Sequence, residues 1–281
     1  MAPFCHAALS HIPETQHTDD AALTTLVSMV TSTAPRRALV TGASSGIGAA
    51  TALRLTSEGW QVFAVARRAE KLESLAEQEG IIPLVCDVTD VDQVAAVRER
   101  ITEDGGIDTL INNAGGALGV DTVAEGSLED WRWMFEVNVL GTLNVTQAFL
   151  PMLRAHGEGT VLNLTSTAGI VSYEGGGGYN AAKFGAHGMT GTLRLEEAEH
   201  NIRVIEVLPG LVRTEEFTTK RLRGDAAAAE KVYAGVDKPL TAEDIAEVIT
   251  HAVTLPHHVN LDQIVVRPVA QAAQHKVIRK G

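Results

Sequence analysis

The sequence predicts an α/β protein with a doubly wound parallel sheet, and two observations support this prediction. Short apolar runs alternate with helical patterns along the chain from Arg37 onward. A glycine-rich turn directly follows the first apolar run and opens the first helical pattern. Such alternation is typical of strands joined through helices into one parallel sheet.

Seven apolar runs are short enough to be buried parallel strands. The predicted strands lie at 38–41, 61–66, 81–86, 108–111, 159–164, 202–208 and 262–266. The predicted helices between them lie at 47–58, 69–79, 90–103, 128–154, 178–199 and 242–254. Because these strands fill a single sheet, we expect one domain over residues 36–281.

Three segments fall outside this alternation. Residues 1–35 show no sustained periodicity, and we expect a flexible N-terminal extension. The interval 211–240 is too long for a simple connection and is predicted to be a helical lid over a substrate site. The basic tail 267–281 follows the last strand and could reach a neighbouring subunit.

Composition excludes several classes of protein. The chain has 281 residues and a formal charge of −12, which disfavours nucleic-acid binding because that binding needs Lys and Arg to neutralise phosphates. No apolar run approaches the ~18 residues of a membrane span, and the N-terminus lacks a secretory signal pattern. Cys5 and Cys86 cannot form a disulfide framework, and no metal-ligand spacing occurs. We therefore expect a cytoplasmic protein without a metal, in which Cys86 is a small buried apolar residue.

The glycine-rich turn TGASSGIG predicts a phosphate site. Its glycines permit a tight turn and a close backbone approach, and the following helix N-terminus favours an anion. Glycines alone would also suit an ordinary turn, but this position after the first strand favours dinucleotide binding in a Rossmann fold. The predicted cofactor contacts here are Thr41, Gly42, Ser44, Ser45, Gly46, Ile47 and Gly48.

The end of the second strand indicates which dinucleotide binds. Ala66 stands where an NAD-binding chain usually carries an acidic residue for the ribose 2′-hydroxyl, and Arg67 and Arg68 follow it. Arginine accommodates a 2′-phosphate. The alternative, a solvated helix start, is disfavoured because positive charge near a helix N-terminus is mildly unfavourable. The sequence predicts NADP(H), with Arg67→Asp weakening NADP far more than NAD.

Tyr179 and Lys183 in YNAAK stand four residues apart, so their side chains project from one face of a helix. A neighbouring ammonium lowers the pKa of a phenol, so we expect Tyr179 to move protons near neutral pH. Ser166 lies thirteen residues upstream and could bind the same substrate oxygen, or merely cap a turn. This chemistry suits the interconversion of an alcohol and a carbonyl.

The order of these motifs extends over most of the chain and resembles the short, single-domain branch of the short-chain dehydrogenase/reductase family over residues 37–266. The motifs that carry the resemblance are TGASSGIG, CDV at Cys86–Val88, NNAG at Asn112–Gly115, Asn138 in FEVNVLG, Ser166, YNAAK, and PGLVRT at Pro209–Thr214. Members of the family are usually tetrameric, which implies a homotetramer.

The resemblance also implies individual roles. Tyr179 would be the acid/base, Ser166 would orient the substrate oxygen, and Lys183 would contact the nicotinamide ribose. Asn138 would kink its helix and hold a water on a proton relay through Lys183. The remaining cofactor contacts would be Asp87 and Val88 at the adenine, the NNAG residues Asn112, Asn113, Ala114 and Gly115, and Pro209, Gly210, Val212 and Thr214 at the nicotinamide.

The second half of the chain is also similar to the NADP-dependent 3-hydroxy acid dehydrogenases, in YEGGGGYNAAK, PGLVRTEEF and LPHHVNLDQIVVRPV. That similarity implies a small substrate such as serine or allo-threonine. Arg213 and Arg221, with Lys220 and Arg223, could bind a carboxylate, because arginine can do so in bidentate fashion. A solvated charged loop is an equal alternative for each of them.

Two other functions stay open at this point. One is a broader ketone or aldehyde reductase of secondary metabolism, which could act on a bulkier substrate. Gly175–Gly178 carry no side chains, which could leave room for substrate or merely give flexibility. The other is a regulator that binds NADP without turnover, which has no need of the full set of Asn138, Ser166, Tyr179 and Lys183. His187, one turn beyond Lys183, is interpreted as a packing or surface residue.

Overall fold

The structure is a computed structural model, and it describes residues 35–214 and 216–280. Nearly all of the predicted N-terminal extension at 1–35 lies outside the described residues. Within the described ranges, no helix combines the length and the apolar character that a membrane span requires.

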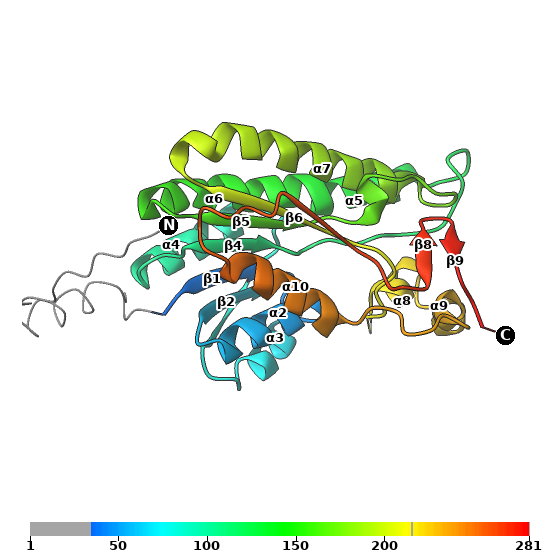
Figure 1. Cartoon of the computed structure of the whole chain (residues 1–281), viewed down its shortest axis with the longest axis horizontal. Helices are drawn as coiled ribbons and strands as arrows, with labels where there is room; N and C mark the ends of the chain where they lie inside the picture. The colour runs from blue at the N-terminus through cyan, green and yellow to red at the C-terminus, as the bar shows by residue number, and fades with distance from the viewer. Residues whose placement is uncertain (1–34, 215, 281) are drawn as a thin grey trace, which may run out of the picture. The chain divides into compact units, whose positions relative to one another are not determined.

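Seven parallel strands form one sheet in the order β3-β2-β1-β4-β5-β6-β7 (Figure 1). The strands are β1 (Arg37–Thr41), β2 (Gln61–Ala66), β3 (Ile81–Val85), β4 (Thr109–Asn112), β5 (Thr160–Leu164), β6 (Arg203–Pro209) and β7 (Gln263–Val266). The order reverses between β1 and β4, which is the doubly wound pattern. The predicted seven-stranded Rossmann fold is confirmed.

Helices cover both faces of the sheet (Figure 1). One face carries α2 (Gly46–Ser57), α3 (Ala69–Leu75) and α10 (Ala242–Thr254). The other carries α4 (Val91–Glu103), α6 (Gly141–His156) and α7 (Gly177–Glu197), with α5 (Leu128–Phe135) packed against α7. Side-chain caps begin three of these helices: Asp90 accepts from backbone N–H groups of α4, Ser127 accepts from one at α5, and Thr241 forms a capping box with Asp244 at α10.

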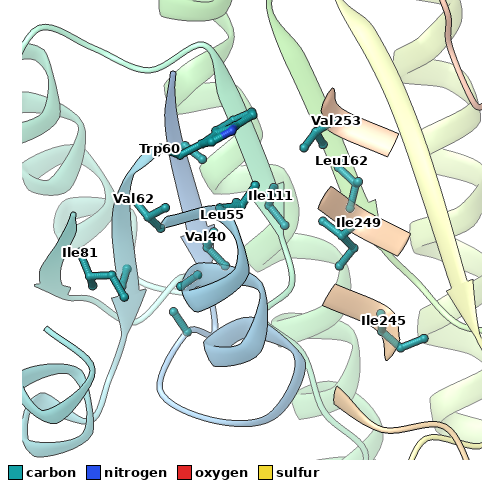
Figure 2. Close-up of a cluster of buried hydrophobic side chains, with 14 of the residues drawn as sticks. Val40, Leu55, Trp60, Val62, Ile81, Ile111, Leu162, Ile245, Ile249 and Val253 are labelled. Carbon is teal, nitrogen blue, oxygen red and sulfur yellow. The ribbon is translucent and has the colours of Figure 1, made fainter. Parts of the chain in front are cut away.

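The apolar runs that predicted the strands are the core. Figure 2 shows Val40 and Val62 of the sheet meeting Leu55 of α2, with Ile249 of α10 beside them. All four side chains are fully buried. A parallel sheet that is covered by helices on both faces needs apolar side chains on both faces. This explains why the strands are continuous apolar runs and do not alternate apolar with polar residues.

The predicted helix 128–154 is interrupted by a π turn over Glu136–Leu140, which divides it into α5 and α6. The Asn138 side chain lies in this turn, and its Nδ2 donates to the Met134 carbonyl at 2.7 Å. A side chain inserted into the backbone ladder is a recognised cause of a kink.

The lid interval contains α8 (Phe217–Arg221) and α9 (Ala226–Tyr233), so its helical character is confirmed. The tail contacts its own chain, and its predicted reach to a neighbouring subunit stays a prediction. It forms the hairpin β8 (Gln271–Ala273) and β9 (Lys276–Val277), and Arg279 then donates to backbone carbonyls at the end of α9. Backbone carbonyls that α9 leaves free at its end provide these acceptors.

Candidate active site

A cavity of about 610 Å³ lies at the carboxyl ends of the strands, beside the point where the strand order reverses. Its walls come from the turns after β1 to β6 and from the lid segment. This is where ligands bind in open α/β sheets, and the volume lies in the range of ordinary small-molecule sites.

The glycine-rich turn is built for close backbone packing. Gly42 has φ +67°, and a Cβ there would lie 2.8 Å from Asn113 Nδ2. A Cβ on Gly48 would lie 2.4 Å from the same atom and from the Gly42 carbonyl oxygen. Asn113 Nδ2 in turn donates to the Thr41 carbonyl at 2.8 Å. Glycine is therefore required at both positions.

Two of the seven predicted contacts in this turn do not line the cavity. Thr41 is buried, and its hydroxyl accepts the backbone N–H groups of Asn113 and Ala114 at 3.0 Å. Gly48 packs beneath the turn, so both residues support the loop from behind. The other five line the cavity, where Ser45 begins α2 without a side-chain cap. The helix N-terminus therefore presents free N–H groups to an anion.

Arg67 and Arg68 differ in their surroundings. Arg68 donates to the hydroxyls of Ser44 and Ser45, both at 2.8 Å through Nη2. Arg67 is more exposed and lies 3.5 Å from Asp87 Oδ2. Both line the cavity, but Arg68 is the one held within a cluster of hydrogen-bonding groups. The substitution that the sequence suggested for testing cofactor preference was at Arg67. The sequence does not show which of two neighbouring side chains points towards the phosphate site, so it could not favour Arg68.

The α7 helix carries Tyr179 and Lys183 on one face, and both are buried beside the cavity. Lys183 Nζ donates to the Leu164 carbonyl at 3.2 Å and lies 5.8 Å from the Tyr179 ring centroid. Ser166 both lines the cavity and caps a short 3₁₀ turn, accepting from Ala168 N at 3.1 Å. The three predicted side chains therefore come together at one end of the cavity.

Burial changes the pKa of the Tyr179 phenol in the opposite direction to the one predicted from the sequence. Desolvation raises the pKa of Tyr179 above its usual value, and the smaller opposing effects come from Ser166 and Arg221. Desolvation also lowers the pKa of Lys183 to about 8, against the opposing charge of Glu206. The prediction that Lys183 lowers the pKa of Tyr179 is wrong for these surroundings, because burial disfavours both charged forms.

Asn138 does not line the cavity but lies directly behind it. Its Nδ2 donates to the Gly116 carbonyl at 2.8 Å, and its Oδ1 accepts from Gly116 N at 3.2 Å. A Cβ on Gly115 would lie 2.6 Å from Asn138 Oδ1 and 3.5 Å from Lys183 Nζ. The glycine thus permits Asn138 and Lys183 to approach the same backbone segment.

The remaining predicted cofactor contacts also line the cavity. They are Asp87, Val88, Asn113, Ala114, Gly115, Pro209, Gly210, Val212 and Thr214. Asn112 is the exception in its motif, because it lies buried in β4 and donates to Asn163 of the neighbouring strand β5 and to Thr146 of α6. Cys86 is buried as expected, and burial raises the pKa of its thiol to about 11.

The four lid cations separate into different environments. Arg213 pairs with Glu230 at 2.6 Å and does not line the cavity, which agrees with the alternative of a solvated charged loop for this residue. Arg221 also does not line it, although its guanidinium lies 5.7 Å from the Tyr179 ring centroid. Lys220 and Arg223 do line the cavity, and Arg223 pairs with Asp130.

Sequence reasoning missed two acidic residues at this site. Glu216 lines the cavity and binds Arg68, although it is 148 residues away in sequence. Glu206 is fully buried in β6, and His187 Nδ1 lies 2.9 Å from its carboxylate, so His187 is a polar partner of this acid. A single acid inside the apolar run IRVIEVL was a usable signal, because a buried carboxylate needs a partner.

The fold and this cavity define a dinucleotide-binding α/β protein, and comparisons with known proteins give its family. A family model described as short chain dehydrogenase matches residues 36–224. An uncharacterized oxidoreductase of Mycobacterium tuberculosis is 50% identical over 241 residues, which are 86% of this chain and 94% of the relative. Sulfoacetaldehyde reductase 2 of Chromohalobacter salexigens is 40% identical over 240 residues, which are 83% of this chain and 94% of the relative.

A solved structure agrees with these relatives. The closed form of serine dehydrogenase complexed with NADP⁺ aligns with a TM-score of 0.82 and 34% identity, over 87% of this chain and 100% of that chain. This chain belongs to the short-chain dehydrogenase family, as its motifs predicted, and it is an oxidoreductase.

Proposed function

We propose that this protein is an NADP(H)-dependent dehydrogenase that interconverts a hydroxyl and a carbonyl on short 3-hydroxy acids such as serine or allo-threonine. One observation carries the proposal. A single cavity holds Ser166, Tyr179 and Lys183 at one end and Arg68 among serine hydroxyls at the other. A proton donor and a phosphate site in one cavity suit a redox reaction on a carbinol.

The residues present fit a bound NADP(H). Gly42 and Gly46 line the cavity without side chains, so the backbone can approach a pyrophosphate, and the uncapped N-terminus of α2 favours its charge. Arg68 would hold the 2′-phosphate, Asp87 the adenine, and the backbone of Val212 with the Thr214 hydroxyl the carboxamide. When bound, the nicotinamide ring supplies or accepts a hydride.

The side chains at the other end would handle the proton. Tyr179 has a raised pKa, so its phenol is protonated at neutral pH and can donate to a carbonyl oxygen. Ser166 would orient that oxygen. Lys183 has a pKa of about 8 and is largely protonated at pH 7, where it would hold the ribose and pass protons towards Asn138.

Two relatives point to one substrate chemistry. Serine dehydrogenase and sulfoacetaldehyde reductase are named for molecules in which one carbon separates the reacting carbon from an anionic group. A short anionic substrate also suits the space beside Tyr179, where Phe217 packs edge-on at 5.9 Å between ring centroids. The carboxylate or sulfonate would need a cation close to the phenol.

Arg221 is the best candidate for that cation. Its guanidinium lies within 5.7 Å of the Tyr179 ring centroid, and its Nε, Nη1 and Nη2 donate to Gly119, Tyr173 and Gly175. Three of the five N–H donors of an arginine are used in these bonds, which leaves two for an anion. Arg221→Ala should raise KM for hydroxy acids roughly tenfold or more, because a charge-assisted contact is lost.

The matched control for Arg221 is Arg213→Ala, which removes a lid arginine already paired with Glu230. Its KM values should stay within about twofold, as for most surface substitutions. Equal KM values for Arg221→Ala and the parent protein would contradict the anion contact, while leaving the oxidoreductase assignment intact.

The glycine run before Tyr179 gives little support to a bulky substrate. A Cβ on Gly176 would lie 2.6 Å from Tyr173, and one on Gly178 would lie 2.5 Å from Met134. The absent side chains therefore allow α7 to pack closely against its neighbours and do not open a pocket. A reductase of larger ketones is the second candidate function within this class.

The deciding experiment is NADP-linked oxidation of serine, allo-threonine, 3-hydroxypropionate and 3-hydroxyisobutyrate, with reduction of sulfoacetaldehyde and of bulky ketones beside them. Turnover confined to the short anionic compounds is the expected result. A preference for bulky ketones would favour the second candidate. Tight NADPH binding without turnover on any compound would instead support a regulator. We also propose a homotetramer in the cytoplasm, which light scattering and cell fractionation would test.

A further inference from the structure

One carboxylate of the lid occupies a cluster of three cations at the far end of the cavity from Tyr179. Glu216 accepts from Arg68 Nη1 at 2.7 and 2.8 Å, from Lys71 Nζ at 2.5 Å and from Lys220 Nζ at 2.7 Å. The Ser45 hydroxyl donates to the same carboxylate at 3.4 Å. These contacts form a built anion site that already contains an anion.

The charges in this cluster do not balance. Arg68, Lys71 and Lys220 carry three positive charges against one negative charge on Glu216, so two positive charges remain. Although burial raises the pKa of Glu216, the hydrogen bonds from its three cations hold that pKa far below its ordinary value. The carboxylate is therefore charged throughout the physiological pH range.

The cluster joins two parts of the chain. Arg68 and Lys71 belong to the turn after β2 and the first turn of α3, while Glu216 and Lys220 belong to the lid segment. Glu216 thus ties the lid to the body of the domain through charged groups. Arg68, Ser44, Ser45, Glu216 and Lys220 all line the cavity.

A phosphate monoester needs the same partners that Glu216 uses. It carries a charge of about −1.5 to −2 at pH 7 and has three strong acceptor oxygens. Arginine beside lysine and serine donors is a typical phosphate environment. The two groups are therefore alternatives at one site, because a second anion beside Glu216 meets like-charge repulsion.

We propose that Glu216 is a specificity-determining residue, the internal anion that the 2′-phosphate of NADP(H) competes with for Arg68, Lys71 and Lys220. Entry of the phosphate takes these donors from Glu216, so the phosphate replaces the carboxylate as the anion that joins Lys220 of the lid to Arg68 and Lys71 of the body. NAD(H) has a hydroxyl in place of the phosphate and leaves Glu216 where it is. This inference rests on the proposed use of NADP(H).

The test is the dissociation constant of NADP⁺ and of NAD⁺, measured by titration calorimetry without substrate. Glu216→Gln removes the competing charge but keeps the size of the side chain. The dissociation constant of NADP⁺ should therefore fall roughly tenfold, because the phosphate no longer competes with several partly exposed ion pairs of Glu216. NAD⁺ affinity should stay within about twofold, because no phosphate enters the cluster. Glu216→Ala should shift NADP⁺ affinity in the same direction.

Glu230→Gln is the matched control, since it also removes one ion-paired lid carboxylate but lies with Arg213, outside the cation cluster. It should leave the preference for NADP⁺ over NAD⁺ unchanged. An NADP⁺ affinity that is unchanged or weakened in both Glu216 variants would overturn the inference. A parent protein that binds NAD⁺ as tightly as NADP⁺ would instead overturn the proposed cofactor use.

Discussion

The two ends of the cavity stabilise charged groups in opposite ways. At one end Tyr179 and Lys183 are 8% and 6% exposed, and desolvation determines the pKa of both. At the other end the Arg68 and Glu216 side chains are 37% and 22% exposed and are held by a network of ion pairs. Burial sets protonation at the first end, whereas partner charges set it at the second.

This difference matches the two proposed tasks, proton transfer at the buried end and phosphate binding at the charged end. A buried end can hold a proton donor in one protonation state, because a low-dielectric site penalises charge. A partly exposed end can exchange one anion for another, because water and several cations keep each charge stable. Substitutions at the buried end should therefore change turnover and stability, and those at the charged end should change cofactor affinity.

The largest expected effect is at the phenol. Tyr179→Phe should lower kcat by about 10³-fold, within the range for loss of a general acid or base, because the ring remains but the proton donor is gone. NADP⁺ affinity should stay within about threefold, because the change lies far from the phosphate end. Steady-state kinetics and calorimetry measure these two quantities, and a comparable loss in both would contradict the separation of the two ends.

The second effect concerns stability and pH. The folded protein lowers the pKa of Lys183 from 10.5 to about 8, so burying the charged form costs up to about 3 kcal/mol of unfolding free energy at 1.36 kcal/mol per pKa unit. That cost is fully present below pH 8 and is relieved as pH rises from about 8 towards 10.5. Lys183→Met should therefore be more stable by about 1–3 kcal/mol at pH 7.

Denaturant unfolding of both proteins between pH 7 and 10.5 measures this effect. The stability gap between Lys183→Met and the parent should narrow as pH rises, because only the parent sheds the buried proton. A gap that is constant with pH would show that packing, and not the charge of Lys183, accounts for the change in stability.

The third effect is at the charged end. Arg68→Ala should weaken NADP⁺ binding by about 10- to 100-fold, the loss of charge-assisted hydrogen bonds, with little change for NAD⁺. The smallest effect should be at Arg67, whose side chain is 61% exposed, and Arg67→Ala should weaken NADP⁺ by only about threefold. A larger loss for Arg67 than for Arg68, or equal losses of NADP⁺ and NAD⁺, would reverse this assignment of the phosphate contact.

Much of the fold was predictable because its signals are local. The apolar runs gave each of the seven strands to within about two residues at each end, and the spacing of Tyr179 and Lys183 gave their shared helix face. The prediction of one helix over 128–154 missed the π turn that divides it. That turn depends on the hydrogen bond of the Asn138 amide to a backbone carbonyl, which the sequence does not show. The hairpin in the tail was missed, because its strands are only two and three residues long.

The sequence predicted many residues of the candidate site, but not which of them contact one another. Most residues that the motifs predicted as cofactor contacts line the cavity, while Thr41 and Gly48 support the glycine-rich turn from behind. Arg213 looked equivalent to Arg221 in sequence, but Arg213 pairs with Glu230, whereas the Arg221 guanidinium lies 5.7 Å from the Tyr179 ring centroid. Composition and spacing carry no information on which way a lid side chain turns.

The sequence by itself determined the strands, the glycine turn and the Tyr179–Lys183 pair, because each depends on residues within one element or one turn. Only the tertiary structure decided that burial governs the phenol and the ammonium, and that Glu216 meets Arg68. The physical reason is that solvation and ion pairing depend on what surrounds a group in space, and those surroundings come from segments far apart in the chain.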